Sequence, residues 1–294
     1  MFDKFKANIF FNMSLKRPDI NKAYAMVKET DSWYNTIKKV HESLDEIHEK
    51  PHEIIGITSR DNLKLKAVYY PNNSDVTVIC AHGYTSHAER EWAFPGLFYL
   101  SLGYNVLIPY QRAHGLSEGK YIGFGAKEPL DMIDWVNQIN EMHPNGKIII
   151  HGLSMGGGIV LNMSQYEMDN VKALIADAPN VSIESFFTNG TKMVFKTDSD
   201  KIANYAIKRF EKEFDCNIKD FESIEIVADS KYPILLSAGS EENLEEMLEL
   251  IKKANPNETD IIILPGCNHG NGMYKQTELY QGRIKQFLKN KVEG

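Results

Sequence analysis

The segment that most constrains the fold is residues 147–161, which reads KIIIHGLSMGGGIVL. Three isoleucines lead into the pattern Gly-x-Ser-x-Gly, with Ser154 at its centre, and an apolar run that can form a helix follows. In a strand–turn–helix unit of this kind, the serine occupies a sharp turn that holds its hydroxyl above the sheet. Gly152 and Gly156 suit such a turn because a side chain there would collide with neighbouring backbone. The pattern therefore predicts that Ser154 is a nucleophile.

Strand-like and helix-like segments alternate along the chain from about residue 53. Residues 54–58, 63–70 and 76–81 are rich in strand-forming residues and are separated by turn signals. Predicted helices at 92–102, 129–142, 244–253 and 279–289 then alternate with predicted strands at 105–109, 173–176, 234–238 and 260–264. Such alternation predicts an α/β fold, with a mostly parallel central sheet, helices on both faces and an antiparallel hairpin at its start.

Two regions do not follow this alternation. Residues 1–52 are predicted to form an N-terminal helical arm, with apolar residues at helical spacing and no assigned chemistry. The spaced residues are Ala23, Met26 and Val27, then Trp33, Ile37 and Val40. Residues 53–294 are predicted to form one catalytic domain. Within it, residues 181–230 are helical in pattern and too long for a simple crossover, so we expect a small cap over the carboxyl edge of the sheet.

Composition narrows the range of partners and locations. The formal net charge of −7 argues against nucleic acid and against anionic membrane surfaces as partners. Three cysteines without metal-ligand spacing favour a reducing compartment, and no metal or other cofactor is expected. The apolar run of residues 9–11 is too short for a signal peptide or a membrane span, so we expect a cytoplasmic protein without membrane insertion.

A serine nucleophile needs a base and a group that orients the base. His269 is the one histidine after Ser154, and it lies on a glycine-rich loop behind the last strand-like run. Glu242 follows the strand-like segment YPILLSAG and is the predicted acid. Glu241 and Asp177 remain alternatives for the acid, since each also follows a predicted strand. The expected catalytic set is therefore Ser154, His269 and one of these carboxylates.

The oxyanion formed during acyl transfer needs two preorganised N–H donors. The amide of Met155, directly after the nucleophile, is one predicted donor, and the amide of Tyr84 in the loop His82-Gly83-Tyr84-Thr85 is the other. His82 is expected to be structural, and His151 is expected to lie in the core. Arg112 is expected to pin its loop by a salt bridge to an acid such as Glu128 or Asp131.

These motifs together resemble the α/β-hydrolase superfamily, in particular the bacterial branch related to serine aminopeptidases, monoacylglycerol lipases and feruloyl-type esterases. The matching segments are 82–85, 112–119, 152–156 and 268–270, and the similarity runs from about residue 53 to the end. Relatives usually carry Gly-x-x-Asp followed by Val-Pro at the acid, whereas this chain has Gly239-Ser240-Glu241-Glu242. They also often carry aspartate where this chain has Tyr110 or Gln111.

We expect a serine hydrolase, specifically a carboxylesterase that cleaves small to medium acyl esters through an acyl-enzyme. An aminopeptidase or amidase is an alternative, and Glu184, Asp198 and Asp200 are then carboxylates that could hold a free N-terminus. An acyltransferase of the same fold is a further alternative. A non-catalytic ligand-binding protein is the alternative from another class, supported by the altered acid loop. The expected partner is a small ester or peptide-like substrate, and the sequence does not indicate an oligomeric state.

Overall fold

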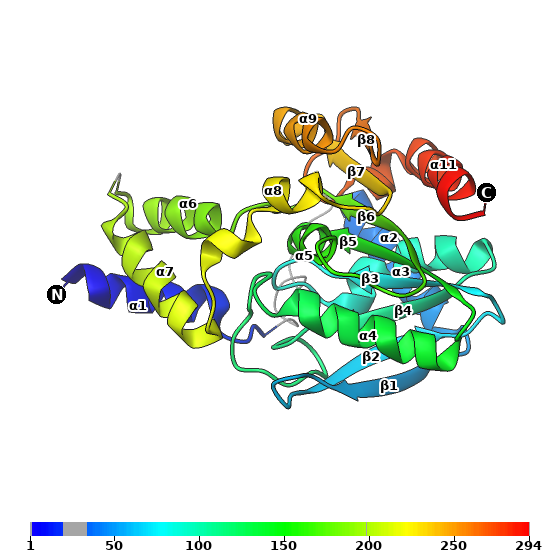
Figure 1. Ribbon diagram of the computed structural model, residues 1–294, viewed down its shortest axis with the longest axis horizontal. Coiled ribbons are helices and arrows are strands. Elements are labelled where there is room, and N and C mark those ends of the chain that lie inside the picture. The colour runs from blue at the N-terminus through cyan, green and yellow to red at the C-terminus, as the bar shows by residue number, and fades with distance from the viewer. Residues whose placement is uncertain (1, 20–33, 198, 294) are drawn as a thin grey trace.

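A computed structural model describes residues 2–19, 34–197 and 199–293. Its centre is an eight-stranded sheet in the order β1-β2-β4-β3-β5-β6-β7-β8 (Figure 1). The strands are β1 (Glu53–Thr58), β2 (Lys64–Tyr70), β3 (Val76–Ala81), β4 (Asn105–Tyr110), β5 (Lys147–Leu153), β6 (Val171–Asp177), β7 (Ile234–Gly239) and β8 (Thr259–Leu264). β2 pairs antiparallel with both β1 and β4, and the remaining pairs are parallel. The predicted α/β fold is confirmed.

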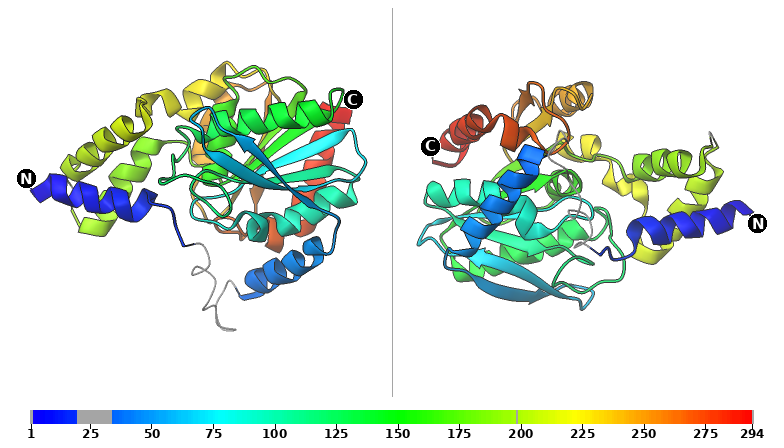
Figure 2. Two further views of the ribbon diagram at one scale, coloured as in Figure 1. Left: turned by 90° about the horizontal axis from the view of Figure 1, so that it is seen from below. Right: turned by 180° about the vertical axis from the view of Figure 1, so that it is seen from behind.

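The helices cover both faces of this sheet. They are α1 (Phe2–Leu15), α2 (Tyr34–His48), α3 (Ala88–Ser101), α4 (Glu128–Met142), α5 (Met155–Met163), α6 (Ile183–Phe195), α7 (Lys201–Phe214), α8 (Ser223–Ala228), α9 (Glu245–Ala254), α10 (Gly272–Lys275) and α11 (Thr277–Leu288), with short turns η1 (Ile218–Phe221) and η2 (Lys289–Glu293). Figure 2 shows α4 on one face and α2, α3 and α11 on the other. No helix of the described residues is both long enough and apolar enough to cross a membrane.

The isoleucines of β5 explain why the sheet is buried on both faces. Successive side chains of a strand point to opposite faces. Accordingly, Ile148 and Ile150 pack into a core with residues of α4 and α5, while Ile149 packs into a second core with residues of α3 and α11. All three side chains are buried. A continuous apolar run is therefore what this central parallel strand requires.

Helices make up most of the described N-terminal residues and of the segment 181–230. α1 packs against α7 and α6, at one end of the molecule, whereas α2 packs against α3 (Figure 1). Segment 181–230 contains α6, α7, η1 and α8. Of the residues expected at helical spacing in the arm, Ala23, Met26, Val27 and Trp33 lie outside the described residues. The division into an arm, a catalytic domain and a cap stays a prediction.

Candidate active site

Ser154 occupies the sharp turn between β5 and α5. Its φ of 58° and ψ of −115° lie in a region that non-glycine residues rarely adopt. The turn is held by backbone hydrogen bonds, because Ser154 N–H donates to Asp177 O at 2.8 Å and Asn180 N–H donates to Ser154 O at 3.0 Å. The strained backbone is thus fixed from the neighbouring strand, and the hydroxyl is held at the carboxyl edge of the sheet.

The two glycines of the motif allow this turn to pack closely. A Cβ at Gly152 would lie 2.1 Å from Gly156 O, and a Cβ at Gly156 would lie 2.0 Å from Ala81 O. Both distances are far below van der Waals contact, and the atoms in the way are backbone. The glycine requirement inferred from the sequence therefore has a direct steric cause at both positions.

The structure brings His269 and Glu242 together with Ser154. His269 Nε2 lies 2.9 Å from Ser154 Oγ, and His269 Nδ1 lies 2.7 Å from Glu242 Oε2. Because the carboxylate can only accept, Nδ1 carries the hydrogen and Nε2 is free to accept from the Ser154 hydroxyl. The Glu242 side chain is 4% exposed and the His269 side chain 57% exposed, so the carboxylate is buried while the imidazole is accessible from the surface.

Glu242 is fixed by the strand end that precedes it. Its Oε1 accepts from Gly239 N–H at 2.6 Å, and its own N–H donates to Gly239 O at 3.1 Å. Glu241 points elsewhere and accepts from Asn268 Nδ2 at 2.8 Å, on the loop that carries His269. The two adjacent glutamates therefore have separate partners, and only Glu242 contacts the imidazole.

Asp177, the third carboxylate considered for the acid, is buried in a different network. It lies 3.0 Å from His151 Nε2 and also accepts from the hydroxyls of Tyr280 and Ser237. His151 is fully buried, as expected for a core residue, and its Nδ1 lies 2.7 Å from Tyr99 OH. Asp177 therefore links β6, β7 and α11 and has no hydrogen bond to His269.

The loop after β3 passes beside Ser154. Gly83 and Tyr84 line a cavity together with Ser154 and His269, and Met155 is the first residue of α5, where helical N–H groups lack intrahelical partners. The Tyr84 hydroxyl donates to Ser14 O of the N-terminal segment, and its ring packs against Phe124 and Phe186. The Tyr84 side chain is thus held against α1 and α6, and the residue borders the cavity at Ser154.

His82 holds this loop in place by hydrogen bonds. It is fully buried, and burial lowers the pKa of its imidazole well below the usual range. The neutral ring donates from Nδ1 to Gly83 O at 2.9 Å and accepts from Gln111 N–H at 3.1 Å. Gln111 Nε2 donates back to His82 O at 2.5 Å. Gln111 therefore ties the loop after β4 to the loop after β3.

Arg112 pins the loop after β4, as the sequence predicts, with Asp131 as its partner. Its Nε and Nη2 each donate to an Asp131 carboxylate oxygen at 2.7 Å. Its Nη1 and Nη2 also donate to the Asp61 carboxylate, at 2.8 and 3.1 Å. Glu128, the other acid considered, instead accepts from the backbone N–H groups of Gly123 and Gly125. Arg112 therefore has a structural role outside the site.

Two cavities meet at Ser154 and His269. The larger cavity, of about 620 Å³, is walled by residues 178–182, Ser185, Glu241 and the apolar side chains of Leu244 and Met247. The smaller cavity, of about 270 Å³, lies on the side of the loop after β3. Two cavities that meet at one hydroxyl can each hold one half of a substrate whose cleavable bond lies at that hydroxyl.

Sequence reasoning missed part of the smaller cavity. Thr36, Ile37 and Val40 of α2 line it, although the N-terminal arm was assigned no chemistry. Glu91 also lines it, and its Oε1 accepts from Gly83 N–H at 2.7 Å. Burial raises the pKa of the Glu91 carboxyl to about 7. Helical spacing marked Ile37 and Val40 as packing residues, but nothing local indicated that they face the site.

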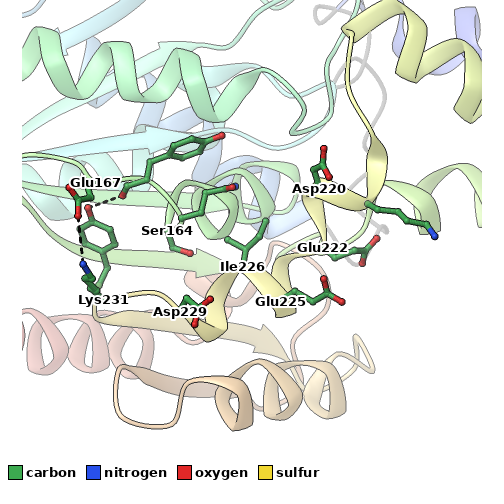
Figure 3. A pocket seen from close by; sticks show the side chains of 12 residues that line it. Ser164, Glu167, Asp220, Glu222, Glu225, Ile226, Asp229 and Lys231 are labelled. Atoms are coloured by element: carbon green, nitrogen blue, oxygen red, sulfur yellow. Dashed lines mark hydrogen bonds and ion pairs between the residues drawn. The ribbon is translucent and has the colours of Figure 1, made fainter.

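A further cavity, of about 520 Å³, lies between the end of α5 and α8 (Figure 3). Its lining includes the acidic residues Glu167, Asp220, Glu222, Glu225 and Asp229. Lys231 pairs with Glu167 at 3.6 Å. None of the predicted site residues lines it. Within the ranges that the structure describes, no group of three or more His, Cys, Asp or Glu side chains is arranged to hold a metal ion.

Comparisons with known proteins match this chain to hydrolases. A family model described as serine aminopeptidase, S33, matches residues 72–265. The uncharacterized protein YqkD of Bacillus subtilis is 36% identical over 111 residues, which is 37% of this chain and 36% of YqkD. The matched stretches span 36% to 47% of the length of the first curated relatives.

Two solved structures illustrate the similarity in fold. The Pyrococcus furiosus esterase Pf2001 has a TM-score of 0.68 at 26% identity, over 95% of this chain and 98% of that chain. An α/β hydrolase from Vibrio vulnificus has a TM-score of 0.62 at 19% identity, over 97% of this chain and 93% of that chain. The second likeness concerns the fold alone.

Proposed function

This chain belongs to the serine aminopeptidase S33 family of the α/β-hydrolase superfamily and is a hydrolase, and from this premise we propose that it is a carboxylesterase. It would cleave small to medium acyl esters through an acyl-enzyme. The observation that carries the proposal is the pair of hydrogen bonds from Ser154 Oγ to His269 and from His269 to Glu242, at 2.9 and 2.7 Å. This arrangement has the geometry of a nucleophile, a base and an orienting acid.

In the proposed mechanism, Ser154 Oγ attacks the ester carbonyl while His269 Nε2 takes its proton. Glu242 holds the imidazole in the tautomer that makes this transfer possible and stabilises the imidazolium. The amides of Met155 and Tyr84 donate to the oxyanion. His269 then protonates the departing alcohol, and water, activated by the same imidazole, cleaves the acyl-enzyme and restores the Ser154 hydroxyl.

The preference for esters is supported by the likeness to an esterase over nearly the whole chain. The larger cavity at Ser154, of about 620 Å³, also suits substrates of modest size, because small-molecule sites are usually about 300–1,000 Å³. The apolar side chains of Leu244 and Met247 make the larger cavity the proposed acyl site.

Labelling with a fluorophosphonate probe, combined with p-nitrophenyl butyrate turnover, tests the mechanism. The wild type should be labelled, and Ser154→Ala should lose both the label and at least about 10³-fold of its turnover. The exposed Ser199 provides a matched control, since Ser199→Ala should keep both. A Ser154→Ala variant with wild-type turnover would contradict the proposal, and an unlabelled, inactive wild type would favour a ligand-binding protein.

An aminopeptidase is the second candidate, and the description of the matched family favours it. The carboxylates considered for N-terminus recognition do not support it. Glu184 and Asp200 line neither cavity at Ser154, and Asp200 pairs with Lys192 at 2.8 Å. Asp198 lies outside the described residues. A panel of p-nitrophenyl esters and aminoacyl p-nitroanilides decides between the two, and product analysis with added alcohols would detect acyl transfer.

A further inference from the structure

The first helix, α1, is apolar on both of its sides. One side is buried against α6 and α7 and includes Phe10, Phe11 and Leu15. The other side carries Phe2, Phe5, Ile9 and Met13, whose exposed fractions are 69%, 61%, 43% and 58%. A helix that is apolar all round is usually covered on all sides. The exposed side of α1 is therefore unusual for a surface helix.

The four exposed side chains form a continuous stripe. At about 100° per residue they fall within an arc of about 80°, opposite the buried side, and they extend over about 17 Å of the helix axis. Contiguous exposed apolar surface of this kind marks an interaction site. We call these four residues the α1 stripe.

The charge around the α1 stripe indicates what covers it. Helices α1, α6 and α7, counted with Asp200 at the start of α7, carry seven basic and five acidic side chains, a net charge of +2, although the formal charge of the whole chain is −7. Lys192 pairs with Asp200 at 2.8 Å, and Arg209 lies over the Phe11 ring on the buried side of α1. The basic residues are Lys4, Lys6, Lys192, Lys201, Lys208, Arg209 and Lys212, and the acidic residues are Asp3, Glu184, Asp200, Glu211 and Glu213. The overall charge disfavours an anionic surface as a partner, but this end of the molecule is locally basic.

Lys6 places one of these charges at the edge of the stripe. Its ammonium lies 4.9 Å from the centre of the Phe2 ring and 5.3 Å from that of Phe195, at the end of α6. Met193 and Val194, just before Phe195, are 77% and 39% exposed. Bulky apolar side chains bordered by basic ones are the pattern of helices that lie in the plane of a lipid interface.

We propose that the α1 stripe docks this protein on an anionic lipid surface, with α1 lying parallel to that surface. The apolar side chains enter the boundary between headgroups and acyl chains, and the basic side chains of α1, α6 and α7 meet the anionic headgroups. A second copy of the chain would bury the same stripe, but it would bring two basic surfaces together. The lipid surface satisfies both the apolar and the charged features, and it requires no spanning helix.

Sedimentation with vesicles tests the proposal without relying on activity. The full chain should co-sediment with phosphatidylcholine vesicles that contain about 30% phosphatidylglycerol, and binding should weaken when NaCl rises from about 50 to about 500 mM. Binding to pure phosphatidylcholine vesicles should be weaker. The double variant Phe5→Ser/Ile9→Ser should lower the partition coefficient by at least about tenfold, because two large apolar side chains no longer enter the interface.

Two further variants separate the lipid contribution from general effects. Leu250→Ser, which removes a 49% exposed leucine from α9, should bind vesicles like the wild type. Lys6→Glu should reduce the dependence on phosphatidylglycerol while leaving the thermal unfolding midpoint nearly unchanged. Equal binding of the wild type and the double variant would overturn the proposal. A second result would also overturn it: the wild type binds neither type of vesicle but is a dimer by light scattering, and the double variant is a monomer.

Discussion

Replacing Glu91 with glutamine should change how the stability of this protein depends on pH. The carboxyl group accepts from Gly83 N–H at 2.7 Å, and burial raises its pKa from 4.5 to about 7. A glutamine has nearly the same shape, and its carbonyl oxygen can accept the same hydrogen bond, but it never becomes charged. The substitution therefore removes the cost of a buried carboxylate without removing the contact to Gly83.

The sign and size follow from the linkage between protonation and folding. Because the folded-state pKa lies above the unfolded value, Glu91 contributes stability that is fully present below pH 4.5 and is lost as the pH rises through 7. The difference between the two pKa values corresponds to at most about 3 kcal/mol of unfolding free energy. Between pH 5 and pH 8 the wild type should therefore lose about 2 kcal/mol relative to the glutamine variant.

Urea denaturation at pH 5 and pH 8 measures this difference. Glu91→Gln should be close to the wild type at pH 5 and more stable at pH 8, and Glu249→Gln, at an exposed position of α9, should follow the wild type at both. If the difference in unfolding free energy between the wild type and Glu91→Gln is the same at pH 5 and pH 8, then Glu91 does not titrate in this pH range. The reasoning from burial would then be refuted.

Four further substitutions test three other parts of the structure. Glu242→Gln should lower kcat/KM for p-nitrophenyl butyrate by about 10²–10⁴-fold, whereas Glu241→Gln should have little effect. Similar losses in both variants would contradict the assignment of Glu242 as the acid. Gly156→Ala should destabilise the protein by about 3 kcal/mol or more in urea denaturation, since its Cβ would overlap Ala81 O, and a near-neutral change would show that the turn can relax. Arg112→Leu should cost about 3–5 kcal/mol because it leaves Asp131 buried without its partner, and a loss below about 1 kcal/mol would mean that water replaces the guanidinium.

Features encoded by neighbouring residues could be predicted from the sequence. The turn at Ser154 depends on Gly152, Gly156 and the flanking apolar runs, all within a few residues. The same holds for the strand ends that precede Glu242 and His269, because each side chain lies on the loop directly after its strand. Once the sheet is parallel, those loops must gather at one edge. The structure brings the three predicted side chains together at that edge.

Features that depend on distant packing could not be predicted. Asp177 and Glu242 both follow predicted strands, and the sequence favoured Glu242 while leaving Asp177 as an alternative. Only the tertiary structure reveals that Asp177 instead bonds with His151, Tyr280 and Ser237. Glu91 looked like one of many charges on a helix, and its burial depends on the loop after β3. The apolar start of the chain gave no sign that α1 packs on α7, about two hundred residues away in sequence.

The contact of α2 with the smaller cavity links the start of the chain to substrate choice. Thr36, Ile37 and Val40 supply one wall beside Ser154, while the sheet that positions Ser154, Glu242 and His269 begins only at residue 53. A shortened protein that starts at β1 would therefore keep Ser154, Glu242 and His269 but lose one boundary of the smaller cavity. The shape of that cavity and the hydrogen-bonded set around Ser154 are thus encoded in separate stretches of the chain, so substitutions in α2 change the first without touching the second.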